Sequence, residues 1–206
     1  MVNSPDTPIG HRHLKITAPS PWVKRFAPLI PAGGRVLDLA CGNGRHARYL
    51  IERGCFAVAL DRDVSAVADL APSPRAQVIE ADLEDGGAWP LAGQRFDGIV
   101  VVNYLYRPLF PHLLDGLAEG GVLIYETFAR GNEAFSRPRN PDHLLRSGEL
   151  IDAVGGRLQI VAYEHGRIES GPLPGVIQRI CAVNDRGRSA RADGEPAPHR
   201  VEAGPD

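Results

Sequence analysis

The sequence predicts an α/β protein built on a doubly wound sheet, with five parallel strands followed by a C-terminal antiparallel pair. Between residues 18 and 184, apolar runs of strand length alternate with helical patterns, and this alternation is typical of parallel βαβ units. The last two strand-like runs are separated only by residues 169–175. Because parallel strands need a long crossover, such a short connection predicts that the final pair is antiparallel.

The first half of this domain contains three expected strands and three expected helices. Ser20 followed by Pro21 is a helix-start signal, and apolar residues continue on one helical face as far as Ile30. Gly54 is suited to end the second helix in a left-handed conformation. The expected strands are 35–39, 56–60 and 76–81, and the second and third helices are 43–53 and 64–70.

The second half supplies the remaining strands. Residues 96–102 are almost all apolar, as expected of a strand that is buried on both faces. Leucines recur at helical spacing, and a second helical pattern, 147–154, ends at Gly155. The leucines are Leu109, Leu113, Leu114 and Leu117. The other expected strands are 121–128, 158–168 and 176–183.

Composition and charge exclude several classes of protein. The chain has 206 residues, 43% of them hydrophobic, with a formal net charge of −2, so neither nucleic acid nor a membrane is expected as a partner.

Residues 18–184 are expected to form one domain between a flexible segment, 1–17, and a disordered tail, 185–206. No apolar run could span a bilayer, no signal-peptide pattern is seen, and the three cysteines form no CxxC pair. We therefore expect a cytoplasmic protein without disulfides or a bound metal.

A glycine-rich turn, DLACGNGR at residues 38–45, joins the first expected strand to the following helix. Gly42 and Gly44 have no Cβ, so the backbone can turn sharply and a ligand can approach it closely. The helix that follows offers free N–H groups and a partial positive charge to an anionic ligand group. Taken alone, the turn also fits the dinucleotide fingerprint G-x-G-x-x-G/A, with Ala47 in the last place.

Three acidic residues, Asp38, Asp61 and Asp82, lie at or just after the carboxyl ends of the first three expected strands. Ligands of open α/β sheets bind at these ends. Asp61, after the second strand, can accept hydrogen bonds from two ribose hydroxyls, and Asp82, after the third, can accept one from an amine. Asp38 can meet an ammonium group. These positions suit a ligand with an amino acid group, a ribose and an adenine, and S-adenosylmethionine has this outline.

Five segments carry a resemblance to a known family: VLDLACGNG (36–44), VALDRD around Asp61, EADLED with Asp82 and Leu83, FDGIVVVNYL (96–105) and LAEGGVLIYETF (117–128). Over about residues 20 to 184, the chain resembles the class I S-adenosylmethionine-dependent methyltransferases. The segment DLACGNGRHARYL is similar to the small bacterial tellurite-resistance branch of that family. The resemblance implies a Rossmann-like, seven-stranded methyltransferase fold with S-adenosyl-L-methionine as cofactor.

The resemblance also implies a binding role for each matching residue. Asp38 would position the methionine amine through water or backbone, and the methionine end would be lined by Ala40, Gly42 and Gly44. Asp61 would hold the ribose and Asp82 the adenine amine, while Leu83 packs on the ring with its N–H near a ring nitrogen. Asn103, after the fourth strand, would flank the reactive sulfonium.

Tyr104 and Glu126 are the expected catalytic residues. Tyr104 follows the fourth strand and Glu126 lies near the end of the fifth. An acceptor site would be built there, together with the polar segment 129–145. The rings of Tyr104 and Tyr106 can enclose an acceptor or shield the sulfonium, or they can simply pack beneath this segment. Glu126 is a candidate base or an anchor for the segment. Methyl transfer is an in-line displacement on an activated donor, so a base is needed only for a protonated nucleophile.

Several basic and aromatic residues have two interpretations each. Tyr106, Arg107 and Arg130 are the expected substrate contacts, since arginines can recognise an anionic acceptor, although solvated loop arginines are common. The same applies to Arg137 and Arg139. His46 can touch the cofactor carboxylate or the acceptor, or it can serve in packing or capping. Trp22 can cover the cofactor or anchor the core.

The expected acceptor is a small molecule, such as a thiol, a chalcogen oxyanion or a small metabolite. The N-P-P-Y-type signature of amine methylation on DNA bases or glutamine is absent, because Leu105-Tyr106 follows Asn103-Tyr104, and no cysteine follows the fourth strand for covalent chemistry at carbon-5 of pyrimidines. A non-catalytic S-adenosylmethionine-binding protein is one alternative. A nicotinamide-dependent oxidoreductase is another, but it would not require Asp82 or an early Asp38. The sequence leaves the oligomeric state open.

Overall fold

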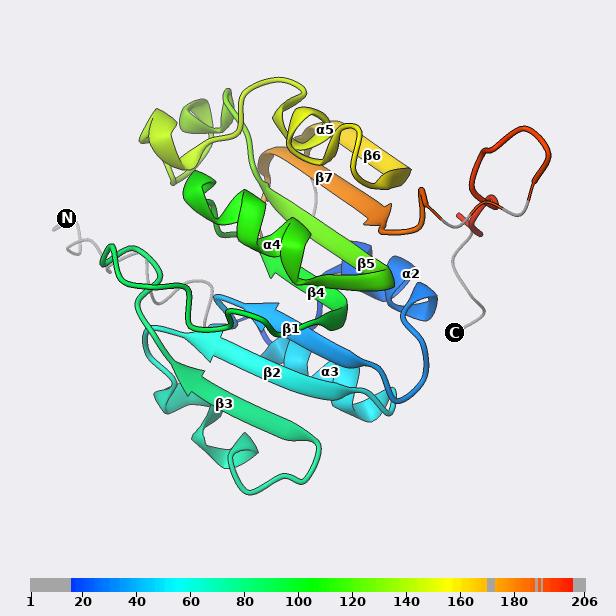
Figure 1. The fold of residues 1–206 in the computed structure, drawn as a ribbon. Coiled ribbons are helices and arrows are strands. Elements are labelled where there is room, and N and C mark those ends of the chain that lie inside the picture. Colours follow the sequence, from blue (N-terminus) through cyan, green and yellow to red (C-terminus); the bar gives the residue numbers. More distant parts are fainter. Residues whose placement is uncertain (1–15, 170–172, 188, 190, 202–206) are drawn as a thin grey trace, which may run out of the picture.

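A seven-stranded sheet with strand order β3-β2-β1-β4-β5-β7-β6 forms the centre of the structure (Figure 1). The computed structural model describes residues 16–169, 173–187, 189 and 191–201. The strands are β1 (Arg35–Leu39), β2 (Phe56–Asp61), β3 (Ala76–Glu80), β4 (Phe96–Val102), β5 (Leu117–Phe128), β6 (Gln159–Ile168) and β7 (Gly175–Val183). β1 to β5 are parallel, whereas β7 is antiparallel to both β5 and β6. The predicted fold class is confirmed.

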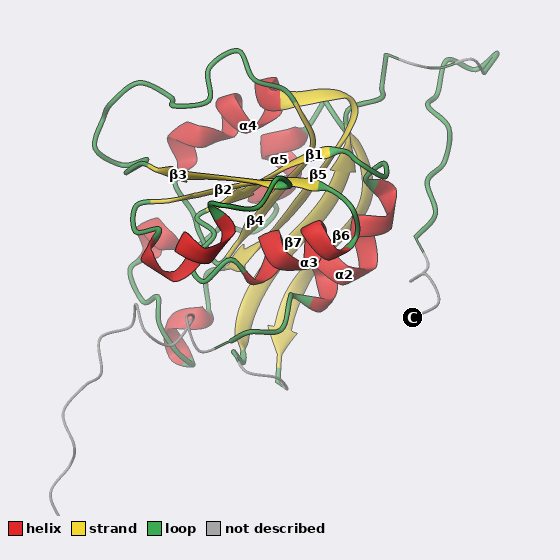
Figure 2. Ribbon diagram, turned by 90° about the horizontal axis from the view of Figure 1, so that it is seen from below, coloured by secondary structure: helices red, strands yellow, loops and turns green. Residues whose placement is uncertain are grey.

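Helices cover both faces of this sheet (Figure 2). α2 (Pro21–Phe26) and α3 (Arg45–Glu52) lie on one face, and α4 (Phe110–Gly116) and α5 (Glu149–Val154) on the other. Side chains alternate along β1 because successive residues of a strand point to opposite faces. Val36 therefore packs with Trp22 of α2 and Leu50 of α3, whereas Leu37 packs with Leu113 of α4.

Local sequence signals explain where the helices begin and end. The hydroxyl of Ser20 accepts a hydrogen bond from the backbone N–H of Trp22 and so caps α2. Pro28 cannot donate a backbone hydrogen bond, and the chain passes into a short 3-10 helix, Ala27–Leu29, instead of continuing α2. Gly54 adopts a φ of 89° just after α3, as predicted. Gly44, with a φ of 71°, is the N-cap of α3, so this helix begins two residues later than expected.

Two predicted elements differ from the structure. Leu117 was expected on a helical stripe, but α4 ends at Gly116 and Leu117 begins β5, where it pairs with Phe96 of β4. Because Leu117 is 2% exposed in the strand, its apolar character fits either element. The helix expected at 64–70 is a 3-10 helix, Ser65–Leu70. No helix in the described part of the chain is long and apolar enough to cross a membrane.

The described residues at the two ends of the chain lie outside this sheet. The predicted flexible segment, 1–17, lies outside the described residues except for its last two positions. In the C-terminal tail, the described residues form no helix or strand. Asp185 contacts His199 at 2.6 Å, and the backbone oxygen of Val201 accepts hydrogen bonds from the guanidinium of Arg25. The tail thus returns to the side of α2.

Candidate functional site

Most of the predicted cofactor residues converge at the carboxyl edge of the sheet. Six of the eight line one cavity of about 470 Å³: Ala40, Gly42, Asp61, Asp82, Leu83 and Asn103. They come from the ends of β1, β2, β3 and β4, which the parallel register brings side by side. The edge lies at the point where the strand order reverses, between β1 and β4, and such a switch point is where open α/β sheets bind ligands.

The glycine turn is shaped by left-handed backbone conformations. Ala40, Gly42 and Gly44 have φ values of 52°, 56° and 71°, a region that side chains disfavour. A Cβ on Gly44 would lie 2.5 Å from Cγ1 of Val67, so only glycine fits there. The turn therefore presents backbone, with little side chain, to the cavity.

Asp61 both orders this turn and keeps acceptor capacity for a ligand. Its Oδ2 accepts a hydrogen bond from the N–H of Gly42 at 2.8 Å, and its Oδ1 accepts one from the N–H of Asp63 at 3.2 Å. An ionised carboxylate offers about four acceptor positions. The side chain is thus fixed by two donors while it can still accept from two hydroxyl groups.

Asp38 lies behind the turn and does not line the cavity of about 470 Å³. It is 1% exposed, and its Oδ2 accepts a hydrogen bond from the N–H of Ala47 in α3 at 2.8 Å. Burial raises the pKa of Asp38 to about 7. Asp38 therefore joins β1 to α3, and any effect on a ligand amine passes through the backbone of the turn. Gly44, the N-cap of α3, is outside the cavity as well.

Asp82 and Leu83, which follow β3, line the cavity of about 470 Å³, hereafter called the cofactor cavity. Oδ1 of Asp82 accepts the N–H of Glu84 at 2.9 Å, which fixes the turn after β3. Both residues also border a separate cavity of about 200 Å³, together with Tyr106 and the stacked rings of Trp89 and His112. Tyr106 was expected at the acceptor, but the structure places it in this separate cavity.

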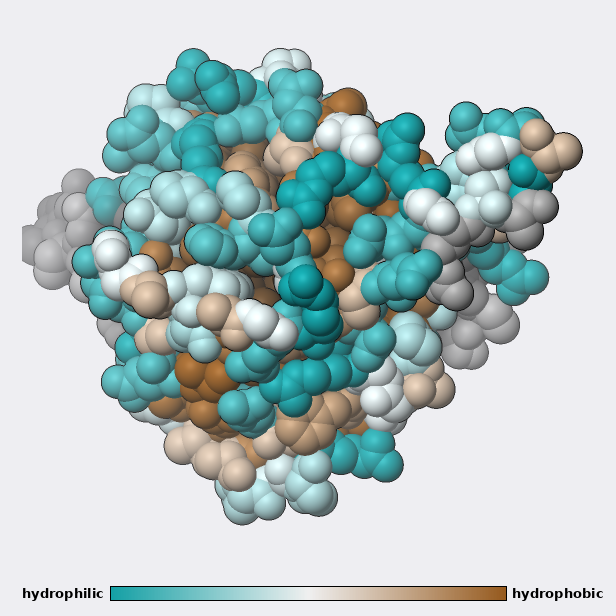
Figure 3. Space-filling model, in the orientation of Figure 1, coloured by the Kyte–Doolittle hydropathy of each residue, from teal (hydrophilic) through white to brown (hydrophobic). Residues whose placement is uncertain are grey.

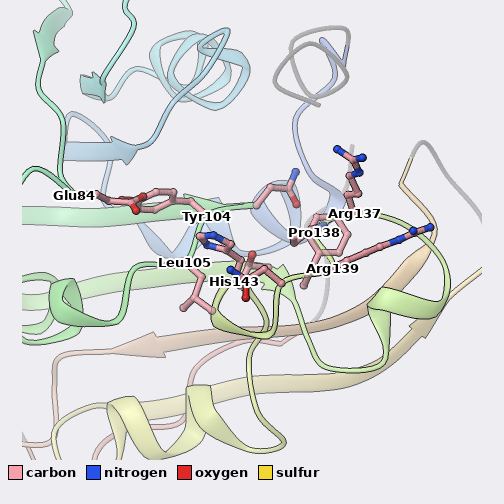
Figure 4. Close-up of a pocket in the computed structure, with 11 residues that line it drawn as sticks. Glu84, Tyr104, Leu105, Arg137, Pro138, Arg139 and His143 are labelled. Atoms are coloured by element: carbon pink, nitrogen blue, oxygen red, sulfur yellow. The ribbon is translucent and has the colours of Figure 1, made fainter. Parts of the chain in front are cut away.

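A further cavity, of about 300 Å³, adjoins the cofactor cavity (Figure 4). The two share Glu84, Asn103 and Tyr104. The remaining lining residues come from the end of β4, the end of β5 and the loop that follows β5: Leu105, Thr127, Phe128, Arg137, Pro138, Arg139, Asn140 and His143. Glu84, Thr127, Asn140 and His143 were not predicted individually from the sequence, although Asn140 and His143 belong to the segment 129–145 that was expected at the acceptor site.

Asn103 and Tyr104 form the junction between the two cavities. Asn103 has a φ of 60°, an uncommon value for a residue other than glycine, and its N–H donates to the backbone oxygen of Glu126 at 2.8 Å. Burial and the neighbouring carboxylate of Glu84 raise the pKa of Tyr104. Its hydroxyl therefore stays protonated at neutral pH and can donate a hydrogen bond, but it cannot act as a base.

Glu126 serves as an anchor in the structure. Its Oε1 accepts a hydrogen bond from the hydroxyl of Ser20 at 2.9 Å, and its Oε2 pairs with Arg179 at 3.3 Å. The guanidinium of Arg179 lies 4.7 Å from the centre of the Trp22 ring, which is itself 1% exposed and belongs to the core. With both oxygens engaged outside the described cavities, Glu126 fits an anchor for the start of α2 and not the expected base.

Arg107 is also a structural residue. It makes a two-point contact with Glu149, at 2.6 and 3.0 Å, and donates to the backbone oxygens of Asp142 and Leu144. It thereby holds the loop after β5 against α5, and its donors are not free for an acceptor as expected. Arg130 is exposed and lines none of the described cavities.

The segment before α2 is held across the glycine turn. The N–H of Ser20 donates to Nε2 of His46 at 3.2 Å. Burial, reinforced by the charge of Arg45, lowers the pKa of His46 to about 3, so the imidazole is neutral. Because Nε2 accepts, the proton lies on Nδ1, which faces Oδ1 of Asp38 at 3.9 Å. Asn43 and Arg45 donate to the backbone oxygens of Ile16 and Ala18 at 2.9 and 3.0 Å.

An open sheet of this strand order, with a ligand-sized cavity at its carboxyl edge, defines a class I methyltransferase fold. A family model described as a methyltransferase domain matches residues 36–121, the stretch that contains every residue of the cofactor cavity. Over these residues the chain is similar to the methyltransferase-domain family.

Two solved structures illustrate the likeness in fold. TehB from Haemophilus influenzae, of the tellurite-resistance branch, superposes with a TM-score of 0.60 and 17% identity, covering 77% of this chain and 60% of that chain. The N-methyltransferase NodS from Bradyrhizobium japonicum, solved in complex with S-adenosyl-L-homocysteine, superposes with a TM-score of 0.60 and 16% identity, covering 85% and 96%.

Two curated proteins are similar in sequence. An uncharacterized protein of Schizosaccharomyces pombe is 23% identical over 203 residues, covering 74% of this chain and 60% of that protein. The tRNA U34 carboxymethyltransferase of Methylococcus capsulatus is 34% identical over 121 residues, covering 53% of this chain and 36% of that protein. The chain thus spans less than two thirds of the length of either relative.

Proposed function

We propose that this protein transfers the methyl group of S-adenosylmethionine to a small-molecule acceptor. One observation carries the proposal: the cofactor cavity and the adjoining cavity share Glu84, Asn103 and Tyr104. A donor in the first and an acceptor in the second would therefore meet at this junction. The second cavity, of about 300 Å³, is at the small end of ligand pockets, which favours an acceptor of few atoms.

The residues of the cofactor cavity fit the proposed cofactor. Asp61 keeps acceptor capacity for two ribose hydroxyls, and Asp82 is exposed to the cavity with one oxygen engaged by Glu84. Leu83 offers an apolar surface to an adenine ring, and the bare backbone at Gly42 lets the methionine end approach closely. When bound, S-adenosylmethionine supplies a methyl group that its sulfonium already activates.

The chain's own contribution to the reaction is mainly alignment. The junction residues fix the direction from which a nucleophile can approach, and holding reactants in line accounts for a large part of the rate in such displacements. The protonated hydroxyl of Tyr104 can orient the acceptor by donating a hydrogen bond. Where the nucleophile carries a proton, the imidazole of His143 and the carboxylate of Glu84 line the cavity and can accept it.

A nucleic-acid acceptor is the second candidate, because one curated relative is named as a tRNA-modifying enzyme. The net charge of −2 disfavours it, since RNA binding rests on neutralising phosphates. A non-catalytic role in S-adenosylmethionine binding is a third outcome, in which the second cavity receives no acceptor.

The test is transfer of radiolabelled methyl from S-adenosylmethionine into two fractions of a bacterial extract, the small molecules and the total RNA. Label in the small-molecule fraction, lost in a Tyr104→Ala variant that still binds S-adenosylhomocysteine, is the expected result. Label confined to RNA would support the second candidate. Cofactor binding without label in either fraction would contradict an enzymatic role.

A further inference from the structure

We propose that the methyl acceptor is an elongated anionic small molecule, and that Arg137 and Arg139 hold its anionic group. The two arginines lie at the outer mouth of the cavity of about 300 Å³, hereafter called the acceptor cavity. The inference rests on the proposed function, because it concerns the acceptor of the same reaction. It adds a charge requirement that distinguishes one class of acceptor from neutral and cationic ones.

Both arginines line the acceptor cavity from the loop between β5 and α5. Figure 4 shows their side chains extending outward from either side of Pro138, while Tyr104 and Glu84 lie at the opposite end of the lining residues. The guanidinium groups are therefore at the mouth of the cavity and not at its junction with the cofactor cavity. In the space-filling view, the loop region is covered by hydrophilic residues (Figure 3).

Some charged side chains of the loop and its flanks are engaged by other groups of the protein. Glu149 engages both Arg107 and Arg146, at 2.6 and 3.5 Å. Glu133 accepts the backbone N–H of Gly131. Within the described ranges, neither Arg137 nor Arg139 has a hydrogen-bond or ion-pair partner for its side chain. Arginine remains charged at any physiological pH, so two positive charges that have no ion-pair partner in the described part of the chain border one cavity.

The opposite end of the cavity has the opposite sign. Glu84 borders the junction with the cofactor cavity beside Tyr104. A compact oxyanion at the junction would be repelled by this carboxylate. An acceptor with a protonated nucleophilic group at Tyr104 and a carboxylate or similar group at the arginines would instead keep its negative charge away from Glu84 and next to the two positive charges. Guanidinium groups bind carboxylates with two parallel hydrogen bonds.

The test compares acids with their own amides. The probes are 3-mercaptopropionate, β-alanine and 3-hydroxypropionate, each paired with its primary amide, so that nucleophile and length stay the same while the negative charge of the carboxylate is removed. Binding to the S-adenosylhomocysteine complex is measured by saturation-transfer NMR. A charge-assisted hydrogen bond contributes about 1.5–3 kcal/mol, so at least one acid should bind roughly tenfold more tightly than its amide.

Variants locate the preference on the loop. The double variant Arg137→Gln/Arg139→Gln should lose the preference for the acid, whereas Arg130→Gln, an exposed arginine of the same loop outside the cavity, should keep it. The wild type and these two variants should bind S-adenosylhomocysteine equally. Amides that bind as well as the acids, or a preference that survives in the double variant, would overturn the inference. Failure of the wild type to bind S-adenosylhomocysteine would instead count against the proposed function, and acids and amides can still be compared on the free protein.

Discussion

Replacement of Asp61 by asparagine should weaken cofactor binding without disturbing the fold. In the structure, the Asp61 carboxylate accepts the N–H of Gly42 at 2.8 Å and that of Asp63 at 3.2 Å, and it lines the cofactor cavity. Asparagine has nearly the same shape and keeps one carbonyl oxygen, so the contact with Gly42 can persist. What is lost is the negative charge that faces the ribose hydroxyls, together with the second oxygen, which accepts the N–H of Asp63 at 3.2 Å.

The expected size of the effect follows from the two hydroxyls. Hydrogen bonds to a charged group are worth about 1 kcal/mol more than neutral ones. Two such bonds correspond to about 2 kcal/mol, or roughly a 30-fold increase in the Kd. Asp61→Ala should weaken binding further, since it also removes the acceptor for Gly42 and loosens the turn.

Isothermal titration calorimetry with S-adenosylhomocysteine measures this effect without turnover. Asp85→Asn is the matched control, because Asp85 is exposed, lies outside the described cavities and also accepts a backbone N–H, that of Gly87. Its Kd should equal that of the wild type. If both Asp61→Asn and Asp61→Ala bind S-adenosylhomocysteine with the wild-type Kd while remaining folded, Asp61 does not hold the ribose and the reasoning is refuted.

Three further substitutions probe the rest of the site. Tyr104→Phe should leave S-adenosylhomocysteine binding unchanged and slow methyl transfer, and a wild-type rate would mean that the ring only packs. Arg107→Gln removes the main ion-pair partner of Glu149. Chemical denaturation should show that the unfolding free energy falls by about 1 kcal/mol, the low end for a partly exposed ionic contact, and amide hydrogen exchange in the loop after β5 should become faster. Unchanged exchange would contradict the role of Arg107 in holding this loop. Burial lowers the pKa of His46 from 6.5 to about 3, so its stabilising contribution is present above pH 6.5 and is lost as the pH falls. The unfolding free energy of the wild type minus that of His46→Gln should therefore decrease from pH 7 to pH 4. Taking this difference removes the contribution of Asp38, which has the opposite pH dependence and is present in both proteins. A difference that stays constant with pH would contradict a neutral imidazole.

Residues at strand ends could be predicted from the sequence because their position depends on local pattern alone. Asp61, Asp82 and Asn103 each follow or end a recognisable apolar run, and parallel strands place their carboxyl ends at one edge. Their convergence on one cavity therefore needed only the strand assignments. The left-handed conformation of Gly54 followed from glycine chemistry in the same way, whereas α3 begins two residues later than expected.

Roles that depend on a distant partner could not be predicted. Glu126 pairs with Arg179 and Ser20, and Arg107 with Glu149, all far away in the sequence. Nothing in the local pattern tells an ion-paired side chain from one that awaits a ligand. His143 lies on a loop with no periodicity, so its place beside Tyr104 in the acceptor cavity follows only from the path of that loop across the end of β5.

Calorimetric titration of the purified wild-type protein with S-adenosylmethionine, S-adenosylhomocysteine and NADH tests the central claim most directly. The claim is that the cavity at the carboxyl ends of β1 to β4 is built for the methyl donor. The structure predicts micromolar binding of the first two ligands and no binding of NADH. Binding of NADH without binding of S-adenosylmethionine or S-adenosylhomocysteine would contradict it and make the glycine turn a dinucleotide site.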